Sequence, residues 1–427
     1  MKWKSSTIEL ERSRNPSRQT SLQFGQLLLL ALLFAARSVA QVPETQESRA
    51  SALGFAPPSS AEIDHAIALA ANYLEGACGP DGRFIYRINI SSGQQSHSYN
   101  VVRHAGTIYA LGMLQHDSPV KQAFAAMNRA ATFLRHNYIG PGPRPGQLAV
   151  WSKPLPQISS ADLGATGLGL VALTSLEQAK PDSMPLDQLQ ALGSFLLFLQ
   201  RADGSFVSKY SAERGPDESF ESLYYPGEAA LGLIDLYETD HSPVWLAAAA
   251  RALSYLARSR AKLLEVPPDH WALIATAKLL PYYAQSASPA SREELLQHAV
   301  QICQALMKGQ LRNSENRVLD GSFDPTGRTA PSATRVEGLL AALEFLPSGN
   351  LRTQIKDTVD HAIAFLLRAQ IRDGLYAGGM PGLYALKFPE NSAVRIDFVQ
   401  HAMCAWLRYK RLFRPDESLH QTGSQSY

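Results

Sequence analysis

The segment SFLLFLQRADGSF, residues 194–206, decides the fold, because a close copy of it, AFLLRAQIRDGLY, stands at residues 364–376. Both copies read aromatic, Leu, three residues, Gln, two residues, Asp, Gly, one residue, aromatic. Related helix ends recur at Tyr73, Phe133, Phe195, Tyr255, Ala305 and Phe365, with spacings of 60, 62, 60, 50 and 60 residues. A period of this length predicts one supersecondary unit repeated along the chain.

Six segments that are richer in Gly and Ala alternate with these ends, and both sets show the apolar spacing of helices. Small residues let helix backbones approach closely, which is typical of a crowded inner ring. The other set carries more Arg, Gln, Lys and Glu, as outer helices with one wet face do. Six outer–inner pairs predict an all-α protein, an (α/α)6 toroid, with an open solenoid of helix pairs as the structural alternative.

The repeat resembles that of the terpenoid cyclases and protein prenyltransferases, although Phe or Tyr stands here where that family usually has Trp. Similar toroids of six helical hairpins also serve many sugar-active enzymes, so the resemblance implies a fold and not one function. The Asp-x-Asp-Asp motif of the cyclases is absent. Asp397, His401 and Cys404 lie on one predicted helix, whereas the prenyltransferases take their zinc ligands from separate helices, so no metal is expected.

The chain has 427 residues, of which 45% are hydrophobic and 18% are charged, and its net charge is +2. This composition is typical of a protein with a large core and provides no basic patch for nucleic acid. Three cysteines without CxxC spacing are expected to be small buried side chains, and one disulfide is the alternative.

The N-terminus reads as a targeting segment. Arginines precede the apolar run at residues 27–36, and the small residues Ser38 and Ala40 follow it. We expect an exported protein, secreted or periplasmic, without stable membrane insertion after cleavage; an uncleaved anchor is the alternative. The predicted organisation is a signal peptide at 1–40, a linker at 41–60, the toroid at 61–413 and a disordered tail at 414–427.

Polar side chains stand at the starts of the predicted inner helices, and helices that run the same way bring their first turns to one mouth. Carboxylates, histidines and tyrosines there are candidates for acid–base catalysis. These candidates are Glu228, His104, Asp269, Glu337, Asp397 and Tyr225. Aromatic rings stack on sugars and arginines bind carboxylates with two-pronged geometry. The candidates for substrate binding are Tyr99, Asn100, Arg103, His270, Trp271, Arg335, Arg395 and His401.

Two structural interpretations compete with these roles. Asp162 and Asp269 are equally explained as helix caps. Glu228, Glu337, Arg335 and Arg395 are also explained as a ring of buried ion pairs that holds the barrel shut.

The favoured hypothesis is an exported enzyme that acts on an anionic polysaccharide or glycoconjugate, and its reaction type stays open. For hydrolysis, the acid would be Glu228 or Glu337. The base would be Asp269 or Asp397.

Elimination or C5 epimerisation would use His104 for proton transfer, together with Tyr99 or Tyr225. Asn100 and Arg103 would neutralise a uronate carboxylate, and helical spacing is expected to place both on the His104 face. No cofactor is implied. The alternatives are a non-catalytic toroid that binds a glycan or peptide, and a divergent terpenoid-cyclase-like protein.

Overall fold

The computed structural model describes residues 55–312, 317–384 and 392–413. The chain divides into two units, Met1–Ala56 and Pro57–Tyr427, and the helices belong to the second. The predicted signal peptide, most of the predicted linker and the predicted tail lie outside the described residues. Among the helices that are described, none is long and apolar enough to cross a membrane.

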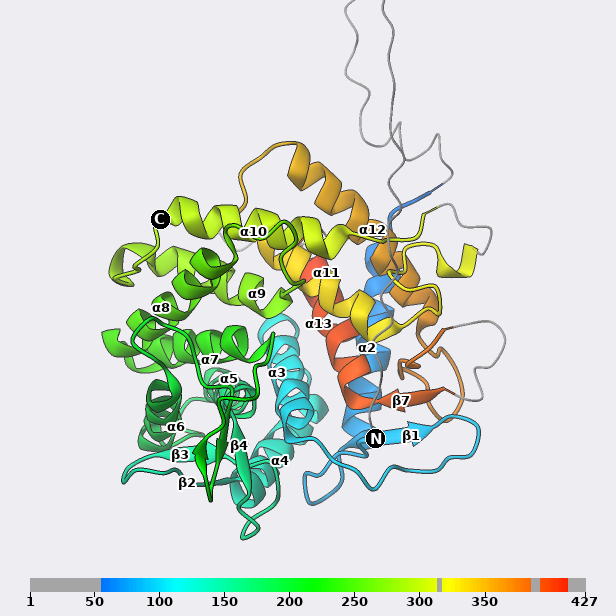
Figure 1. The fold of residues 1–427 in the computed structure, drawn as a ribbon. Coiled ribbons are helices and arrows are strands. Elements are labelled where there is room, and N and C mark those ends of the chain that lie inside the picture. The colour runs from blue at the N-terminus through cyan, green and yellow to red at the C-terminus, as the bar shows by residue number, and fades with distance from the viewer. Residues whose placement is uncertain (1–54, 313–316, 385–391, 414–427) are drawn as a thin grey trace, which may run out of the picture. The chain divides into compact units, whose positions relative to one another are not determined.

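Twelve α-helices alternate between two rings in the described residues. The inner helices are α3 (Val101–Asp117), α5 (Leu163–Ala179), α7 (Tyr225–Asp240), α9 (His270–Leu279), α11 (Thr329–Leu343) and α13 (Ile396–Phe413). The outer helices are α2 (Ser60–Ala77), α4 (Lys121–Tyr138), α6 (Leu186–Leu199), α8 (Pro243–Arg260), α10 (Arg292–Met307) and α12 (Asn350–Ala369). All six repeat positions named above fall in outer helices (Figure 1).

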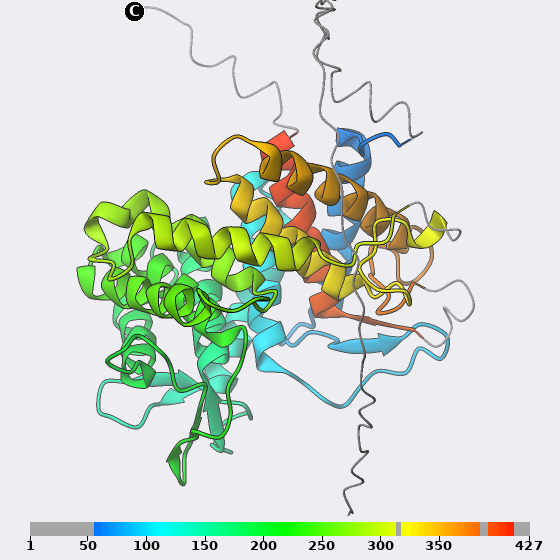
Figure 2. The same ribbon diagram turned by 45° about the horizontal axis from the view of Figure 1, so that its top comes forward.

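The inner helices form a closed ring. Each packs on the next, and α13 packs on α3, which joins the last hairpin to the first (Figures 1 and 2). Glycines permit this crowding, since a Cβ at Gly232 of α7 would lie 2.6 Å from the carbonyl oxygen of Gly167 in α5. The prediction of an (α/α)6 toroid is confirmed, and the open solenoid is excluded.

The repeated glutamine explains why the repeat exists. Nε2 of Gln200, after α6, donates to the carbonyl of Ala248 in α8 at 2.8 Å, and Gln310, after α10, does the same to Thr358 in α12. The last copy, Gln370, reaches back to the carbonyl of Ala66 in α2 at 2.9 Å. Each glutamine therefore ties one outer helix to the next, and the last one closes the outer ring.

The glycine of the repeated Asp-Gly pair is required for steric reasons in three of the copies. Gly82, Gly204 and Gly321 all have positive φ, and each lies under a carbonyl of the following outer helix. A Cβ at Gly204 would lie 2.4 Å from the carbonyl oxygen of Arg251. Only glycine accepts both the conformation and the contact.

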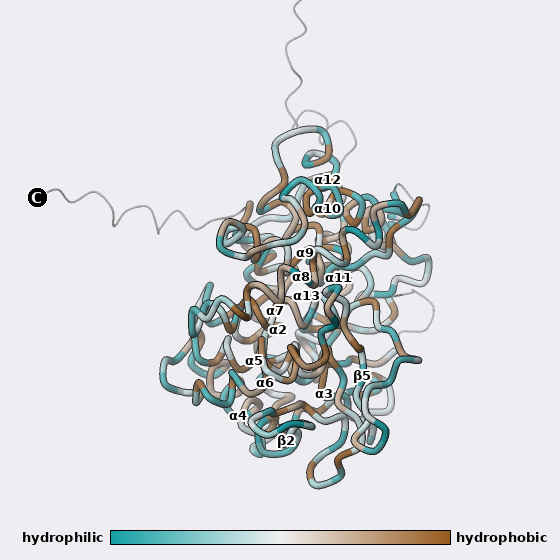
Figure 3. Tube along the Cα trace, turned by 60° about the vertical axis from the view of Figure 1, so that its left-hand side comes forward, coloured by the Kyte–Doolittle hydropathy of each residue, from teal (hydrophilic) through white to brown (hydrophobic). Residues whose placement is uncertain are grey.

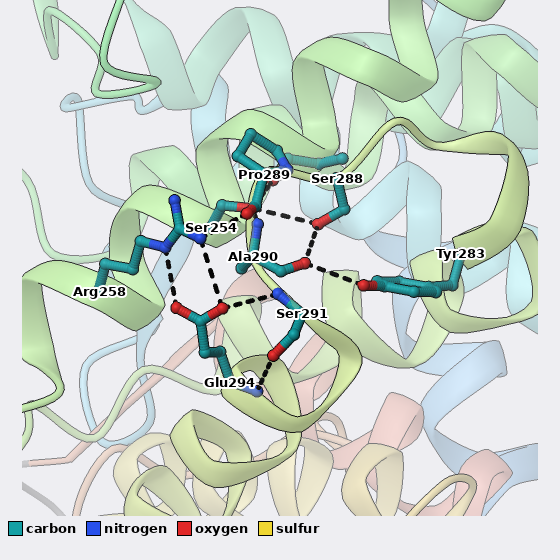
Figure 4. Close-up of polar contacts among 9 residues, drawn as sticks. Ser254, Arg258, Tyr283, Ser288, Pro289, Ala290, Ser291 and Glu294 are labelled. Carbon is teal, nitrogen blue, oxygen red and sulfur yellow. Dashed lines mark hydrogen bonds and ion pairs between the residues drawn. The ribbon is translucent and has the colours of Figure 1, made fainter.

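Polar side chains and backbone groups connect the outer helices α8 and α10 by hydrogen bonds (Figure 4). Ser291 and Glu294 form a capping box at the start of α10, and the same carboxylate accepts from Arg258 of α8 at 2.9 Å. Colouring by hydropathy shows brown, apolar stretches along the helices and teal, polar stretches in many of the peripheral loops (Figure 3).

Short strands lie in the loops before the inner helices. They are β1 (Arg87–Asn89), β2 (Ile139–Pro141), β3 (Leu148–Val150), β4 (Ser160–Asp162), β5 (Lys209–Ser211), β6 (Gly215–Pro216) and β7 (Ala393–Arg395). Two 3-10 helices, η1 (Leu280–Gln285) and η2 (Arg317–Leu319), complete the described elements. Strand β1 pairs antiparallel with β7, with Arg87 opposite Arg395, so the first and last loops are joined at the mouth.

Candidate active site

A cavity of about 360 Å³ opens among the N-terminal turns of the inner helices. We call it the mouth cavity. Its lining comes from the start of α7, the loop before α9, the first turns of α11 and the start of α13. The lining residues are Tyr224, Pro268, Arg328, Ala330, Pro331, Thr334, Arg335, Gly382, Arg395, Asp397, Phe398 and His401.

Among the residues that line this cavity, His401 is a titratable group that is held by a buried carboxylate. Its Nδ1 donates to Oε1 of Glu337 at 2.6 Å, and 15% of its side chain is exposed. Glu337 itself is fully buried and lies more than one turn after the start of α11. Burial lowers the pKa of His401, but the charges of Glu337 and Asp397 outweigh it and raise the pKa above its ordinary value. The raised pKa favours the protonated form of His401, and its Nε2 is left for the cavity.

His270 lies beside His401, with ring centroids 5.8 Å apart and the planes at 75°. It is 2% exposed, and neither ring nitrogen has a hydrogen-bond partner among the described residues. Burial, helped by the charge of His401, holds the pKa of His270 well below its ordinary value. The ring of Tyr224 covers it at a centroid distance of 5.1 Å. The pKa values of the two histidines are thus shifted in opposite directions: that of His270 is lowered and that of His401 is raised.

Asp397 forms ion pairs with an arginine of α3 and an arginine of β7. Its Oδ2 lies 3.0 Å from Nε of Arg103, and Arg395 binds both carboxylate oxygens, at 2.5 and 2.8 Å. Arg103 also donates to the hydroxyl of Tyr86. Both arginines therefore share one carboxylate, which holds them in place and offsets one of their two charges.

Arg335 has a structural partner too. Its Nη1 donates to the last carbonyls of α10, at 3.0 Å to Ala305 and 2.5 Å to Leu306, and its guanidinium lies over the ring of Phe323. The group lines the cavity while it caps an outer helix. The predicted ring of buried ion pairs is not formed, since Arg335 binds carbonyls, Arg395 binds Asp397 and Glu337 binds His401.

Arg328 is a cavity residue that sequence reasoning missed. It is exposed, and its side chain has no hydrogen-bond or ion-pair partner among the described residues. Helix α11 begins at Thr329, directly after Arg328 and earlier than the apolar pattern indicates. The available signal was Pro331, because proline is favoured in the first turn of a helix.

Glu228 occupies a second part of the mouth, against α5. Its Oε2 has no partner among the described residues, and it lies so close to Gly164 that a Cβ there would clash. Burial, together with the charges of Asp269 and Asp162, raises the pKa of Glu228 to about 8. Burial and the nearby Asp162 likewise raise the pKa of Tyr225. Glu228 is thus a protonated acid near neutral pH, although only 4% of the residue is exposed.

Two predicted residues act as helix caps in the structure. Asn100 accepts from the backbone N–H of Arg103 at 3.1 Å at the start of α3. Asp269 accepts from the N–H of Ala272 at 3.1 Å and pairs with Arg260 at 2.9 Å, fully buried. The capping interpretation accounts for Asp269 completely. Asp162 precedes α5 without a side-chain cap bond.

His104 and Tyr99 lie away from the cavity. His104 is fully buried; its Nδ1 accepts from the Tyr99 hydroxyl at 2.7 Å, and its Nε2 donates to the carbonyl of Ala130 in α4 at 2.9 Å. Burial lowers its pKa to about 4. The expected common face does not exist, because Arg103 points to Asp397 while His104 points to the outer helix. Trp271 is also buried, beside Tyr109.

No family model matches the chain. No curated protein matches it either. Three solved structures place the fold. A D-mannose isomerase has a TM-score of 0.63 at 12% identity, covering 83% of this chain and 98% of that one. A cellobiose 2-epimerase from Bacillus thermoamylovorans has a TM-score of 0.62 at 12% identity, covering 82% and 98%.

An unsaturated glucuronyl hydrolase specific for heparin has a TM-score of 0.57 at 12% identity, covering 84% and 99%. All three proteins are named for activities on carbohydrates, and their own lengths are covered almost completely. Identity at this level establishes architecture and not activity. The chain is a six-hairpin (α/α)6 toroid of the kind found in these carbohydrate-active enzymes.

Proposed function

We propose that the protein is a sugar epimerase or isomerase that moves a proton at the carbon next to the carbonyl of a reducing sugar. The observation that carries this proposal is the pair His270 and His401, whose ring centroids lie 5.8 Å apart and whose pKa values are shifted in opposite directions. A neutral base beside a protonated acid is what abstraction and return of one proton require.

The reaction balances with these two groups alone. His270 takes the proton from the carbon, and the electron pair moves into the C–C bond while the carbonyl oxygen takes a proton from His401. The product is an enediol. For the epimer, the enediol turns its other face to the protonated His270, which returns the proton to the same carbon while His401 takes back the proton from the oxygen. For the isomer, His270 gives its proton to the neighbouring carbon while His401 takes the proton of the hydroxyl group on the first carbon, which becomes the new carbonyl. Glu337 holds His401 in orientation and stabilises its charged form.

Access to His270 depends on Tyr224 in this proposal. The Tyr224 ring contacts His270, lines the mouth cavity and is itself 37% exposed, so a rotation of this side chain would open a path to the base. The mouth cavity of about 360 Å³ has room for one or two sugar rings and not for a long chain. Two structural neighbours, a cellobiose 2-epimerase and a D-mannose isomerase, are named for the same kind of chemistry, and this supports the proposal.

An anionic sugar at the end of a glycoconjugate or polysaccharide is the proposed substrate. The support is Arg328, an exposed guanidinium on the cavity wall without a protein partner among the described residues. An arginine in this state binds carboxylate or phosphate with two parallel hydrogen bonds. An exported location is proposed with it, from the apolar N-terminal run of the sequence.

Hydrolysis is the second candidate, and Glu228 favours it. A buried carboxyl group whose pKa is raised to about 8 is suited to protonate a glycosidic oxygen. Neither Glu228 nor His270 is among the residues that line the mouth cavity, whereas His401 is, and this favours the histidine pair.

The test is incubation of the protein with glucose, mannose, cellobiose, glucuronate and galacturonate, followed by chromatography of the products. Epimerisation or isomerisation should fall about 100-fold or more in His401→Gln. The matched control is His298→Gln, a buried histidine of outer helix α10, which should keep the wild-type rate. Release of new reducing ends from an oligosaccharide, lost in Glu228→Gln, would replace the proposal with hydrolysis.

A further inference from the structure

A second and larger cavity, of about 640 Å³, lies at the opposite end of the ring. We call it the distal cavity. It is lined from the C-terminal halves of the inner helices, by Tyr109, Gly112, Met113, Gln115, His116, Ser175, Gln178, Ala179, Leu231, Asp235, Glu238, Ile274, Ala277, Lys278, Pro281, Tyr282, Glu344, Arg408 and Arg411. None of these residues lines the mouth cavity.

Short connections leave this end of the ring open. Helices α3 and α4 are joined by residues 118–120, and α7 and α8 by residues 241–242. The mouth end, by contrast, carries the long loops and the strands. At the rim, the His116 side chain is 75% exposed and that of Arg411 is 44% exposed, so the distal cavity is reached from solvent.

Each of the basic groups Lys278, Arg408 and Arg411 at the distal cavity is paired with a carboxylate of the protein. Lys278 pairs with Asp235 and with Glu238, the latter at 2.9 Å. Arg408 pairs with Glu344 at 2.8 Å, and Arg411 binds Asp117 at 2.8 Å. An ion that entered would have to break one of these pairs. A neutral ligand would not, and each paired carboxylate keeps lone pairs that accept from hydroxyl groups.

Arg408 adds an unused donor. The residue is 8% exposed, its Nη1 and Nη2 bind Glu344 and the hydroxyl of Tyr109, and its Nε has no partner among the described residues. Apolar surface lies beside these polar groups, from the rings of Tyr109 and Tyr282 and from Met113.

Paired charges next to aromatic rings match the two faces of a sugar, which presents hydroxyl groups at its edge and C–H groups on its plane. We propose that the distal cavity is a second ligand site and that it binds a neutral saccharide. The volume fits a disaccharide and lies within the range of small-molecule sites. The site is separate from the proposed catalytic one, and it stands whether or not the mouth performs epimerisation.

Two alanines allow a matched test, because each is partly buried and each lines one cavity. Ala277 of α9 lines the distal cavity, and Ala330 of α11 lines the mouth cavity. Ala277→Phe fills the first and Ala330→Phe fills the second. Hydrogen exchange of the full-length protein is followed by mass spectrometry with millimolar cellobiose or mannose, and with inorganic phosphate as the anionic probe.

Cellobiose or mannose should slow exchange at the C-terminal ends of α7 and α9 in the wild type and in Ala330→Phe. In Ala277→Phe the saccharide concentration needed for this effect should rise about tenfold or more. Protection that survives unchanged in Ala277→Phe would overturn the proposal. Protection of the C-terminal ends of α7 and α9 by phosphate and not by the saccharides would also overturn it. So would the absence of any saccharide-dependent protection there in the folded wild type.

Discussion

Oε1 of Glu337 lies 2.6 Å from Nδ1 of His401, across the interface between α11 and α13. The other carboxylate oxygen, Oε2, is buried without a partner among the described residues. A buried carboxylate with one charged partner holds that partner in its charged form. The two residues are 64 positions apart in sequence, so this contact exists only when α11 and α13 pack together. The protonation of His401 therefore depends on the folded ring of helices.

Glu337→Gln should lower the pKa of His401 by about 1–3 units, since burial then acts against a weaker opposing charge. The measurement is NMR titration of the imidazole signals, assigned with His401→Gln. Glu344→Gln, a carboxylate at the other end of α11 that pairs with Arg408, is the control and should leave the titration of His401 in place. An unchanged His401 pKa in Glu337→Gln would show that the contact has no electrostatic role.

Arg328→Gln should weaken binding of carboxylated or phosphorylated sugars by roughly 10–100-fold, the value of one charge-assisted contact. Neutral sugars should bind as they do to the wild type. Arg214→Gln, an exposed arginine outside the cavity lining, is the control. Equal losses of affinity for neutral and anionic sugars would mean that Arg328 contributes to the shape of the cavity and does not bind the charged group of the sugar.

Glu228 makes stability depend on pH in an unusual direction. Its pKa is raised from 4.5 to about 8 in the folded protein, so folding favours the protonated form. Its contribution is complete below pH 4.5 and is lost as the pH rises towards 8, at up to about 1.4 kcal/mol for each unit. Urea unfolding of Glu228→Gln should therefore show a gain over wild type that grows between pH 5 and 8. The exposed Glu265→Gln should show no such trend, and a flat difference for Glu228→Gln would contradict the assignment.

Gln370→Leu should lower the free energy of unfolding by about 1–3 kcal/mol, because the buried Ala66 carbonyl loses its donor. This bond joins the last outer helix to the first. Gln178→Leu, at an exposed position, should change stability by less than about 0.5 kcal/mol. Equal unfolding midpoints for the two variants would show that the ring closes without the repeated glutamine.

The fold was predictable because the repeat carries the contacts that build it. Gln200 and Gly204 are both needed where one outer helix meets the next, so the same letters recur with the same period. The helix ends that carry these contacts recur six times in the sequence, and counting the helix ends gives the architecture. Cys78 stands where a glutamine is expected, and its thiol lies 3.5 Å from the carbonyl of Ala126, so even a divergent copy keeps the contact.

The candidate site was less predictable, because proximity to a helix start does not fix the direction of a side chain. Arg103 and His104 are adjacent in sequence and point about 100° apart around α3. One reaches the cavity and the other reaches an outer helix. The pKa shifts of His270 and His401 depend on burial and, for His401, on Glu337, which lies on another helix, and no local pattern in the sequence shows that.

The measurement that tests the central claim most directly is solvent hydrogen exchange into the substrate. Reducing sugars, neutral and anionic, are incubated with the protein in D2O, and deuterium at the carbon next to the carbonyl is followed by NMR. Proton transfer by His270 and His401 predicts that deuterium enters at this carbon in the wild type and that its rate falls about 100-fold or more in His401→Gln. Deuterium entry at an equal rate in His401→Gln, or none with any sugar while glycosidic bonds are cleaved, would contradict it.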